Sequence, residues 1–164
     1  MIIYEEVFKA LNKEKIGYLI VGGIAVNLLG LSRATADLDI LIDISRDNII
    51  KIDRILQSLG YRMKHPLKAK DLDKNVLVML SKTKNLKALN YYKLDGINEV
   101  DIIVDSPISF AQAIKRAKKI TVNGIILPVV SIDDLITMKK KIARAVDKFD
   151  VEQLKKLKKL SKSI

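Results

Sequence analysis

The chain has 164 residues, of which 49% are hydrophobic and 30% charged, and this balance is typical of a globular protein with one domain. It has no cysteine and one histidine, His65, which excludes disulfides and thiolate metal sites and nearly excludes zinc chemistry and histidine-based triads. No apolar run approaches the roughly 20 residues that span a bilayer, and no signal-peptide pattern is present. We therefore expect a cytoplasmic protein with no membrane partner.

Hydrophobic periodicity, glycines and capping residues predict alternating elements in the first part of the chain. Ser45 has the residue type of a helix N-cap, and Gly30 follows a short helical pattern that it terminates. The predicted elements are, in order, a helix over 2–14, a strand over 18–21, a helix over 24–29, a strand over 37–42 and a helix over 45–59.

The rest of the chain is expected to be richer in strands. Asp95-Gly96 and Asn123-Gly124 are turn signals, and Ser131 with Asp134 resembles a capping box. This order of elements predicts an α+β fold, with a small mixed β-sheet packed with helices. We expect a single domain over 1–164, made of a core over 1–130 and a C-terminal helical part over 131–164. The predicted elements are strands over 61–63, 76–80, 87–93 and 99–104, a helix over 110–117, two short strands around Asn123-Gly124, and helices over 131–146 and 151–160.

The segment from Leu19 to Asp43 carries the strongest chemical signal. Asp37 and Asp39 alternate with apolar residues on one predicted strand, so their carboxylates point to the same side. Like charges in that position favour a hard divalent cation, and Mg²⁺ typically takes one or two carboxylates together with substrate phosphates. The Gly22-Gly23 pair lies fourteen residues earlier and would let backbone N–H groups approach a phosphate. Together these residues predict a metal–phosphate site.

Asp101 is the candidate for a third carboxylate. It has apolar residues on both sides within a predicted strand, whereas Glu99 and Asp105 lie toward the ends of that strand. The apolar flanks favour placement of Asp101 beside the Asp37–Asp39 pair. The alternative is a strand whose acidic residues all face solvent.

These motifs resemble the polymerase-β-type nucleotidyltransferase fold. The resemblance is carried by Gly22-Gly23, by the segment Gly30-Leu-Ser-Arg-Ala-Thr-Ala-Asp-Leu-Asp39 and by Val-Asp101-Ile. Within that fold, the chain is most similar to small bacterial and archaeal proteins of the AbiEii/MenT toxin-like group. The likeness covers most of the chain and includes a looser block from Ser131 to Asp150.

The resemblance implies roles for the glycines and carboxylates. Gly22 and Gly23 would hold the triphosphate of an NTP. Asp37, Asp39 and Asp101 would bind two Mg²⁺ ions, with Mn²⁺ as an alternative metal. Asp101 would also help deprotonate the acceptor hydroxyl, so that pyrophosphate leaves in an in-line displacement.

The resemblance also implies phosphate ligands among the basic residues. Arg33 could reach phosphate oxygens with its bidentate guanidinium, although it could instead pair with Asp37 or cap a helix. Lys140 and Arg144 are predicted to lie one turn apart on a single helix and to form a second phosphate grip. Lys139 and Lys141 compete with Lys140 for this role, and the sequence does not separate the three.

Three classes of function follow. The leading one is Mg²⁺-dependent transfer of a nucleoside monophosphate from an NTP to a hydroxyl acceptor, with RNA or tRNA as a candidate acceptor, in a toxin-like setting with an antitoxin partner. A small-molecule, antibiotic-type nucleotidyltransferase and a non-catalytic nucleotide-binding or antitoxin module are the alternatives. From Lys139 onward, ten Lys or Arg residues against three acids account for +7 of the net charge of +11, which mildly favours RNA. A solvated, lysine-rich helix face is the other interpretation.

Overall fold

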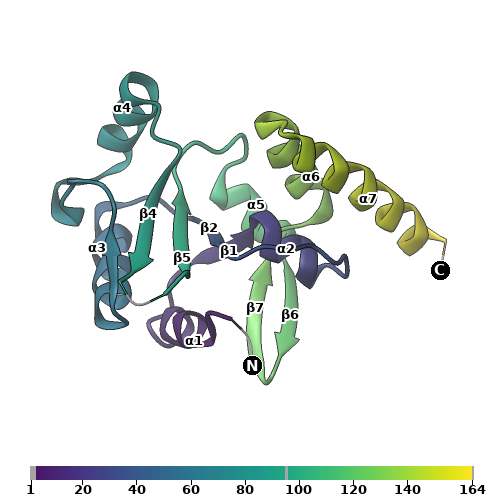
Figure 1. Cartoon of the computed structure of the whole chain (residues 1–164), viewed down its shortest axis with the longest axis horizontal. Helices are drawn as coiled ribbons and strands as arrows, with labels where there is room; N and C mark the ends of the chain where they lie inside the picture. The colour runs from purple at the N-terminus through teal and green to yellow at the C-terminus, as the bar shows by residue number, and fades with distance from the viewer. Residues whose placement is uncertain (1–2, 95, 164) are drawn as a thin grey trace.

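The computed structural model describes residues 3–94 and 96–163, and within these ranges seven strands form one mixed sheet (Figure 1). The strands follow the order β3-β4-β5-β2-β1-β7-β6 across the sheet. They are β1 (Tyr18–Val21), β2 (Leu38–Ile42), β3 (Tyr61–Met63), β4 (Ala88–Lys93), β5 (Glu99–Ile103), β6 (Lys118–Val122) and β7 (Ile125–Val129). The helices are α1 (Glu5–Lys13), α2 (Gly22–Leu28), α3 (Arg46–Ser58), α4 (Lys74–Lys84), α5 (Phe110–Arg116), α6 (Ile132–Ile142) and α7 (Ala145–Lys162), with a 3₁₀ turn, η1 (Ala69–Asp71). The predicted α+β class with a mixed sheet is confirmed.

The central strands β2 and β5 run parallel to one another and have two chemically different faces. In β2, Leu38 and Ile40 are fully buried on either side of the less buried Asp39. In β5, Val100 and Ile102 are buried on either side of Asp101. Because side chains alternate along a strand, the apolar residues pack into the core on one face and the carboxylates point to the other.

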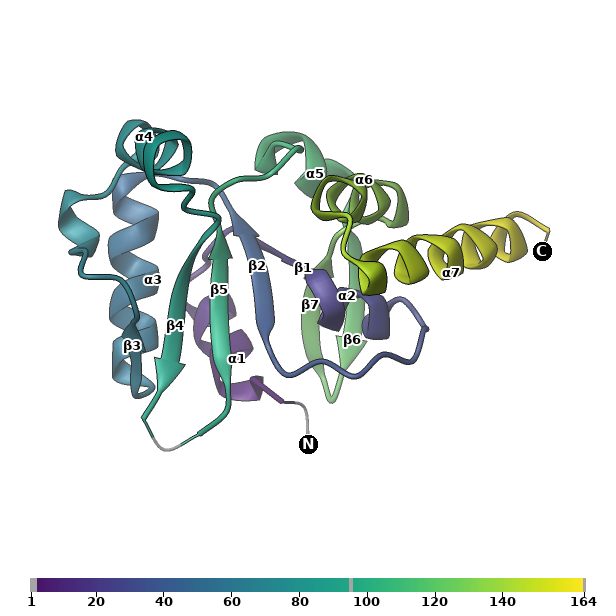
Figure 2. The same ribbon diagram turned by 45° about the horizontal axis from the view of Figure 1, so that its top comes forward.

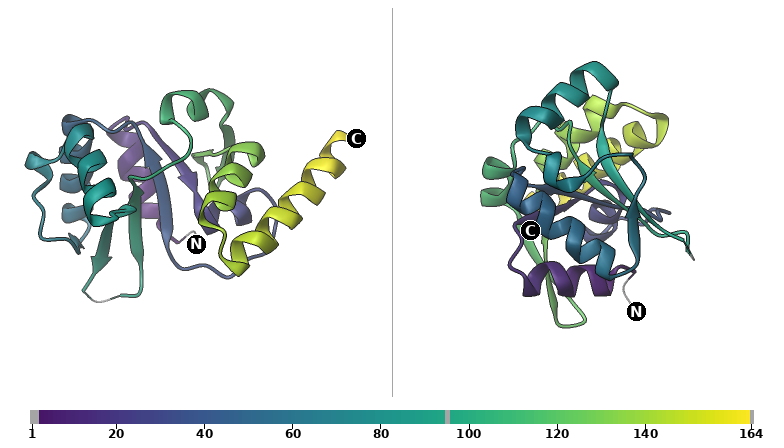
Figure 3. Two further views of the ribbon diagram at one scale, coloured as in Figure 1. Left: turned by 90° about the horizontal axis from the view of Figure 1, so that it is seen from above. Right: turned by 90° about the vertical axis from the view of Figure 1, so that its left-hand side faces the viewer.

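Helices α1 and α3 pack against each other and cover the apolar face. The hydroxyl of Tyr91 in β4 donates a hydrogen bond of 2.9 Å to Asp53 of α3, which places Tyr91 on this covered face and its neighbour Asn90 on the other. Figure 2 shows α4 toward one end of the molecule and α6 toward the other, with the sheet between them. Figure 3 shows that α7 extends away from the rest of the fold.

One predicted strand, 76–80, is wrong, because these residues lie within α4. The side chain of Asp73 caps this helix by accepting a hydrogen bond from the backbone N–H of Val76, and Asn85 ends it in the left-handed conformation at φ 54°. Only Leu77 is buried, while Val78 and Met79 are exposed. A short continuous apolar run fits a buried strand and a helix equally well, so periodicity alone did not distinguish them.

The boundary between the last two helices also differs from the prediction. Helix α6 ends at Ile142 rather than at residue 146, because Ala143 takes the left-handed conformation at φ 56°. Helix α7 then begins at Ala145 instead of at residue 151. The chain therefore reverses at Ala143-Arg144, and Asp147 lies in the first turn of α7. This short connection allows the two helices to pack against each other.

Several local predictions are confirmed. Asn123 and Gly124 both have positive φ and join β6 to β7 in a hairpin, and Ser45 and Ser131 cap α3 and α6. Asp95 of the predicted Asp95-Gly96 turn and residue 2 of the first predicted helix lie outside the described residues. No helix in the described part of the chain combines the length and apolar character that crossing a membrane requires.

Candidate active site

The carboxylates of Asp39 and Asp101 meet on neighbouring parallel strands. The register pairs Asp39 directly with Asp101, and both side chains are partly exposed to one cavity. Asp37 immediately precedes β2, is exposed and lines the same cavity. The hydroxyl of Tyr4 hydrogen-bonds the backbone of Ala36 and Glu99, which ties the segment before Asp37 to the start of β5.

This arrangement concentrates negative charge. Burial raises the pKa of Asp39 to about 7, and the charges of Asp101 and Asp37 add to the effect, whereas Lys139 and Arg144 oppose it. Burial likewise raises the pKa of Asp101, while a hydrogen bond from a neighbouring amide lowers it. A raised carboxylate pKa means that burial and neighbouring negative charges destabilise the ionised form more than the nearby cations stabilise it. A metal cation bound beside the carboxylates would stabilise their ionised form.

Close packing against side chains of the site requires glycine at both positions of the pair. Gly22 has φ 65°, and a Cβ atom there would lie 1.9 Å from Oδ2 of Asp39. A Cβ atom on Gly23 would lie 2.3 Å from Nη1 of Arg33 and 2.5 Å from Oγ1 of Thr35. Any side chain at either position would therefore occupy the space that these groups use.

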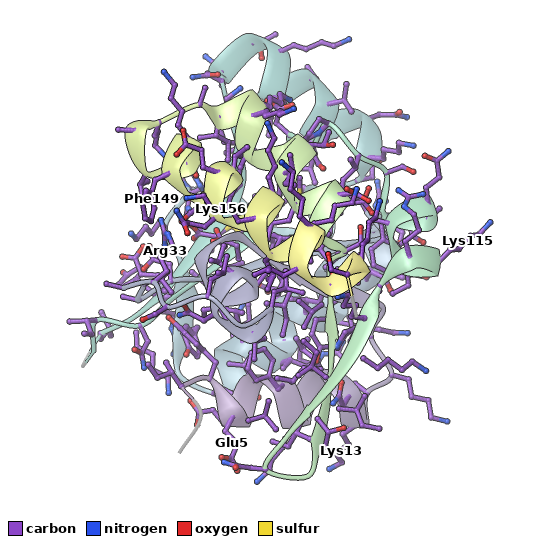
Figure 4. The ribbon with its side chains drawn as sticks, turned by 90° about the vertical axis from the view of Figure 1, so that its right-hand side faces the viewer. Glu5, Lys13, Arg33, Lys115, Phe149 and Lys156 are labelled. Carbon is purple, nitrogen blue, oxygen red and sulfur yellow. The ribbon has the colours of Figure 1, made fainter. Side chains whose placement is uncertain are left out.

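Arg33 is held by both its backbone and its side chain. The side-chain amide of Asn27 hydrogen-bonds the backbone N–H (2.8 Å) and C=O (2.9 Å) of Arg33. Nε of Arg33 lies 2.9 Å from Oδ2 of Asp150 in α7. This contact is an ion pair, but its geometry is not that of a hydrogen bond. Figure 4 shows Arg33 at the edge of the molecule that also carries Phe149 of α7. Arg33 thus pairs with α7 and not with Asp37.

A buried ionic network connects Arg33 to the last two helices. Nζ of Lys139 lies 2.7 Å from Asp150 and 3.3 Å from Asp147, and all three residues are at least 97% buried. Nε of Arg144 donates to Asp147 at 2.7 Å, while 65% of the Arg144 side chain stays exposed. Burial alone would raise the pKa of Asp147, but Arg144 and Lys139 together hold it below its ordinary value. The network contains three cations and two carboxylates, so it adds positive charge beside Asp39.

Most of the basic residues that were predicted to bind phosphate line the cavity, but one of them does not. Arg33 and Arg144 line the cavity, and so do Lys139 and Lys141, whereas Lys140 is exposed and is not part of the lining. The predicted spacing of Lys140 and Arg144 along one helix is wrong, because α6 ends before Arg144. Lys139 is buried and Lys140 is exposed because adjacent residues of a helix point about 100° apart, so that only one of them can face the core.

One cavity of about 1130 Å³ is lined by the glycine pair, the three aspartates, Arg33, Lys139 and Arg144, and it extends beyond them. Past Asp101, its wall is mainly apolar and carries a charged cluster in which Asp105 accepts from Nζ of Lys87 and Nζ of Lys141, each at 2.6 Å. Lys84 also lines this part. The apolar lining includes Pro66, Leu67, Leu80, Leu86, Ile103, Pro107, Met138 and Ile142. The cavity therefore has a carboxylate–cation part and an apolar, lysine-bearing part.

The donor set suits a hard divalent cation. Among the described residues, no three acidic or histidine side chains are gathered into a ready-made metal site. Asp39 and Asp101 nevertheless provide two carboxylates from adjacent strands, and Mg²⁺ needs only one or two carboxylates when substrate phosphates complete its shell. Oxygen-only donors with excess negative charge fit that ion.

Two features of the site were not predicted from the sequence: the hydrogen bonds of Asn90, and the ion pairs of the buried carboxylates in α7. Nδ2 of Asn90 donates to Oδ1 of Asp101 (2.8 Å), and Oδ1 of Asn90 lies 2.9 Å from Nε2 of His65. No sequence signal marks Asn90, because strand register brings it opposite Asp101. The buried carboxylates of Asp147 and Asp150 did leave a signal, since they share one helical stripe with the apolar residues that follow them in α7.

Solved structures of nucleotidyltransferases share this fold. The lincosamide antibiotic adenylyltransferase LnuA, bound to lincomycin, matches with a TM-score of 0.63 and 15% identity over 95% of this chain and 98% of that chain. ANT(2'')-Ia, in complex with adenylyl-2''-tobramycin, matches with a TM-score of 0.57 and 14% identity over 96% and 92%. A proposed nucleotidyltransferase from Thermotoga maritima, TM1012, matches with a TM-score of 0.58 and 18% identity over 98% and 91%. At these identities the likeness concerns the fold alone.

No curated protein matches the sequence at a significant level. A family model matches residues 1–164 of the chain. The match therefore includes the glycine pair, the three carboxylates and the C-terminal ionic network. The chain accordingly belongs to the family described as nucleotidyl transferases of unknown function (DUF2204), and it is a nucleotidyltransferase.

Proposed function

We propose that the protein transfers a nucleoside monophosphate from an Mg²⁺-bound NTP to a hydroxyl group of an acceptor. The observation that carries this proposal is the pairing of Asp39 with Asp101 beside Gly22, in a cavity that also contains arginine and lysine side chains. Carboxylates for a divalent ion and cations for phosphates are the two requirements of phosphoryl-transfer chemistry.

Asp37, Asp39 and Asp101 would hold two Mg²⁺ ions, or Mn²⁺ in their place. When bound, the ions neutralise phosphate charge and align the attacking and leaving oxygens. The acceptor oxygen forms a bond to the α-phosphorus of the NTP, and the bond between that phosphorus and the bridging oxygen breaks, so that pyrophosphate leaves with the electron pair. Asp101 takes the proton of the acceptor hydroxyl.

The phosphates would be held by the glycine backbone and by cations that line the same cavity. Gly22 and Gly23 line this cavity, and their backbone N–H groups would donate hydrogen bonds to a phosphate. Arg144 is the best-placed cation, because it lines the cavity and its guanidinium is mostly exposed. Cavity lining also favours Lys139 or Lys141 over Lys140 as the lysine of this grip. Arg33 would add charge from its position against α7.

The acceptor is proposed to be an anionic alcohol, with the hydroxyl end of an RNA as the leading candidate. In the apolar part of the cavity, Lys84, Lys87 and Lys141 outnumber the one carboxylate, Asp105. Both oxygens of Asp105 are already paired with lysines, so an incoming cation would meet net positive charge. The same positive charge would attract an acceptor that carries phosphate groups.

A small-molecule acceptor is the second candidate. LnuA was solved with lincomycin and ANT(2'')-Ia with an adenylylated tobramycin, and both share the fold. The apolar lining of the cavity favours an acceptor with an apolar body. The lysines argue against polycationic aminoglycosides such as tobramycin, because like charges repel.

We also propose a toxin-like setting of the AbiEii/MenT kind with an antitoxin partner. Its support is the resemblance of the C-terminal block together with the nucleotidyltransferase family. Induced expression in a bacterial host, with and without the product of any adjacent gene, tests this setting. Growth arrest that the adjacent product relieves would support it, whereas unaffected growth of cells making active enzyme would contradict it.

The transfer reaction is tested with each α-labelled NTP and Mg²⁺, offered with total RNA, lincomycin or tobramycin. We expect label in RNA, and loss of that label in Asp39→Asn. Asp71→Asn serves as the matched control, because Asp71 is exposed and outside the cavity. Label only in an antibiotic would replace the RNA acceptor by the second candidate. Absence of both labelling and Mg²⁺-dependent NTP binding would overturn the proposal.

The charge of the acceptor has its own test. Lys141→Gln should raise the KM for RNA and reduce the salt dependence of RNA binding by about one unit of slope, as expected for one lost phosphate contact. Lys155→Gln, an exposed lysine on α7 outside the cavity, is the control. Equal salt slopes in the wild type and Lys141→Gln would exclude Lys141 from acceptor binding.

A further inference from the structure

His65 and Asn90 form a hydrogen-bonded pair that leads directly to Asp101. Asn90 lies in β4 and is paired in register with Asp101 of β5, so their side chains emerge on the same face of the sheet. His65 follows β3, and the backbone N–H of Lys64 donates to the C=O of Asn90 at 2.8 Å. Both His65 and Asn90 line the cavity and are half-buried.

The direction of each hydrogen bond follows from the chemistry of the groups. A carboxylate only accepts, so Asn90 must present its amide nitrogen to Oδ1 of Asp101, at 2.8 Å. Its amide oxygen then faces Nε2 of His65, at 2.9 Å, and needs a donor, so Nε2 donates this hydrogen bond. Asp101 determines which end of the Asn90 amide faces it, and His65 holds the other end of the amide. Together, Asp101 and His65 hold one orientation of Asn90.

We propose that Asn90 and His65 are positioning residues for Asp101 in the transfer reaction. Asn90 engages Oδ1 of Asp101, which fixes the plane of the carboxylate and leaves Oδ2 for a metal ion or for the proton of the acceptor hydroxyl. His65 acts through Asn90 by holding its amide. This inference rests on the proposed function, because it assigns the role of Asp101 there.

The side chains of this pair are not needed to hold the strands together. Backbone pairing joins β4 to β5 from Ala88 to Tyr92, and joins β3 to β4 through the residues before His65. The polar side chains therefore serve the cavity face of a sheet that is already formed. Hydrogen-bond partners of metal-binding side chains commonly act in this way, and their removal costs roughly 10- to 100-fold in activity or metal affinity.

The test compares Asn90→Leu, His65→Leu and His65→Gln with the wild type. Leucine is similar in size to asparagine but cannot hydrogen-bond, whereas glutamine places an amide N–H near the position of Nε2. Asn75→Leu, an exposed site on α4 outside the cavity, is the matched control. Transfer kinetics are measured alongside Mn²⁺ binding by electron paramagnetic resonance, in the presence of a non-hydrolysable NTP analogue. The Mn²⁺ measurement needs no turnover.

We expect Asn90→Leu and His65→Leu to lower kcat roughly 10- to 100-fold with little change in the KM for NTP, and to weaken Mn²⁺ binding. His65→Gln should restore most of both. If the wild type binds Mn²⁺ and NTP but both leucine variants match it in Mn²⁺ binding and kcat, the positioning role is refuted. Failure of His65→Gln to rescue a defect in His65→Leu would refute the role of His65. A wild type that binds neither metal nor NTP would refute the proposed function instead, which keeps the two failures distinct.

Discussion

Replacing Asp39 with asparagine should stabilise the metal-free protein while it abolishes transfer. Asp39 has an ordinary carboxylate pKa of 3.8 in the unfolded chain and a pKa of about 7 in the folded protein. Between these values, the folded state keeps a proton that the unfolded state has released. The free energy of unfolding therefore declines as the pH rises from about 4 to 7. The amide that replaces the carboxylate in Asp39→Asn does not titrate, so the variant should escape this decline.

The magnitude follows from the pKa difference. A shift of one unit corresponds to about 1.4 kcal/mol, so the raised pKa of Asp39 sets an upper limit of about 4 kcal/mol above pH 7. Partial solvent exposure reduces this limit, and we expect Asp39→Asn to gain about 2 kcal/mol at pH 8. At pH 4, where the folded wild type holds Asp39 protonated, the variant and the wild type should differ little.

The assay is urea unfolding of the wild type, Asp39→Asn and the exposed control Asp71→Asn at pH 4 and pH 8 in EDTA. Adding Mg²⁺ and an NTP analogue at pH 8 should stabilise the wild type more than Asp39→Asn, because bound cations compensate the carboxylates. A stability gain that is equal at the two pH values, or a loss at pH 8, would falsify the account of Asp39 as an uncompensated carboxylate.

Four further substitutions, one of them a control, are tested by urea unfolding and transfer assays. Gly22→Ala should destabilise the fold and abolish transfer, because its Cβ would lie 1.9 Å from Oδ2 of Asp39. Gly124→Ala, which also has positive φ but open space around it, should cost only about 1 kcal/mol, so equal losses would contradict the steric argument. Lys139→Met should destabilise the fold by up to about 3–5 kcal/mol, because it removes the buried cation that Asp147 and Asp150 share and leaves them only Arg144 and Arg33. An unchanged urea midpoint would show that water or another group compensates them. Ser131→Ala should lose about 1 kcal/mol with the cap of α6, with transfer retained.

Chemical patterns that are local in the sequence could be interpreted without a structure. Asp37, Asp39 and the glycine pair lie within one short segment, and alternation along a strand determines which side chains share a face. Asp101 was identified because a carboxylate between apolar strand residues is unusual. The hairpin at Asn123-Gly124 and the caps at Ser45 and Ser131 were predictable, because these residue types have strong local conformational preferences.

Features that depend on distant contacts were not predictable in the same way. The run from Val76 to Leu80 satisfies both a strand and a helix pattern, and packing decides between them. The choice among Lys139, Lys140 and Lys141 depends on which face of α6 meets α7. Buried carboxylates from α7 hold Lys139, whereas Lys141 is exposed and pairs with Asp105.

The sequence by itself determined the fold class and showed a glycine pair close to two carboxylates, because alternation, capping and charge repulsion act between residues close along the chain. The resemblance of these motifs to nucleotidyltransferases indicated what they do. Only the tertiary structure decided that Asn90 holds Asp101, that Arg33 meets Asp150, and that lysines surround the far part of the cavity. Strand register and helix packing bring these residues together from distant parts of the chain. Such contacts arise from the packing of the whole fold, and a local pattern does not encode them.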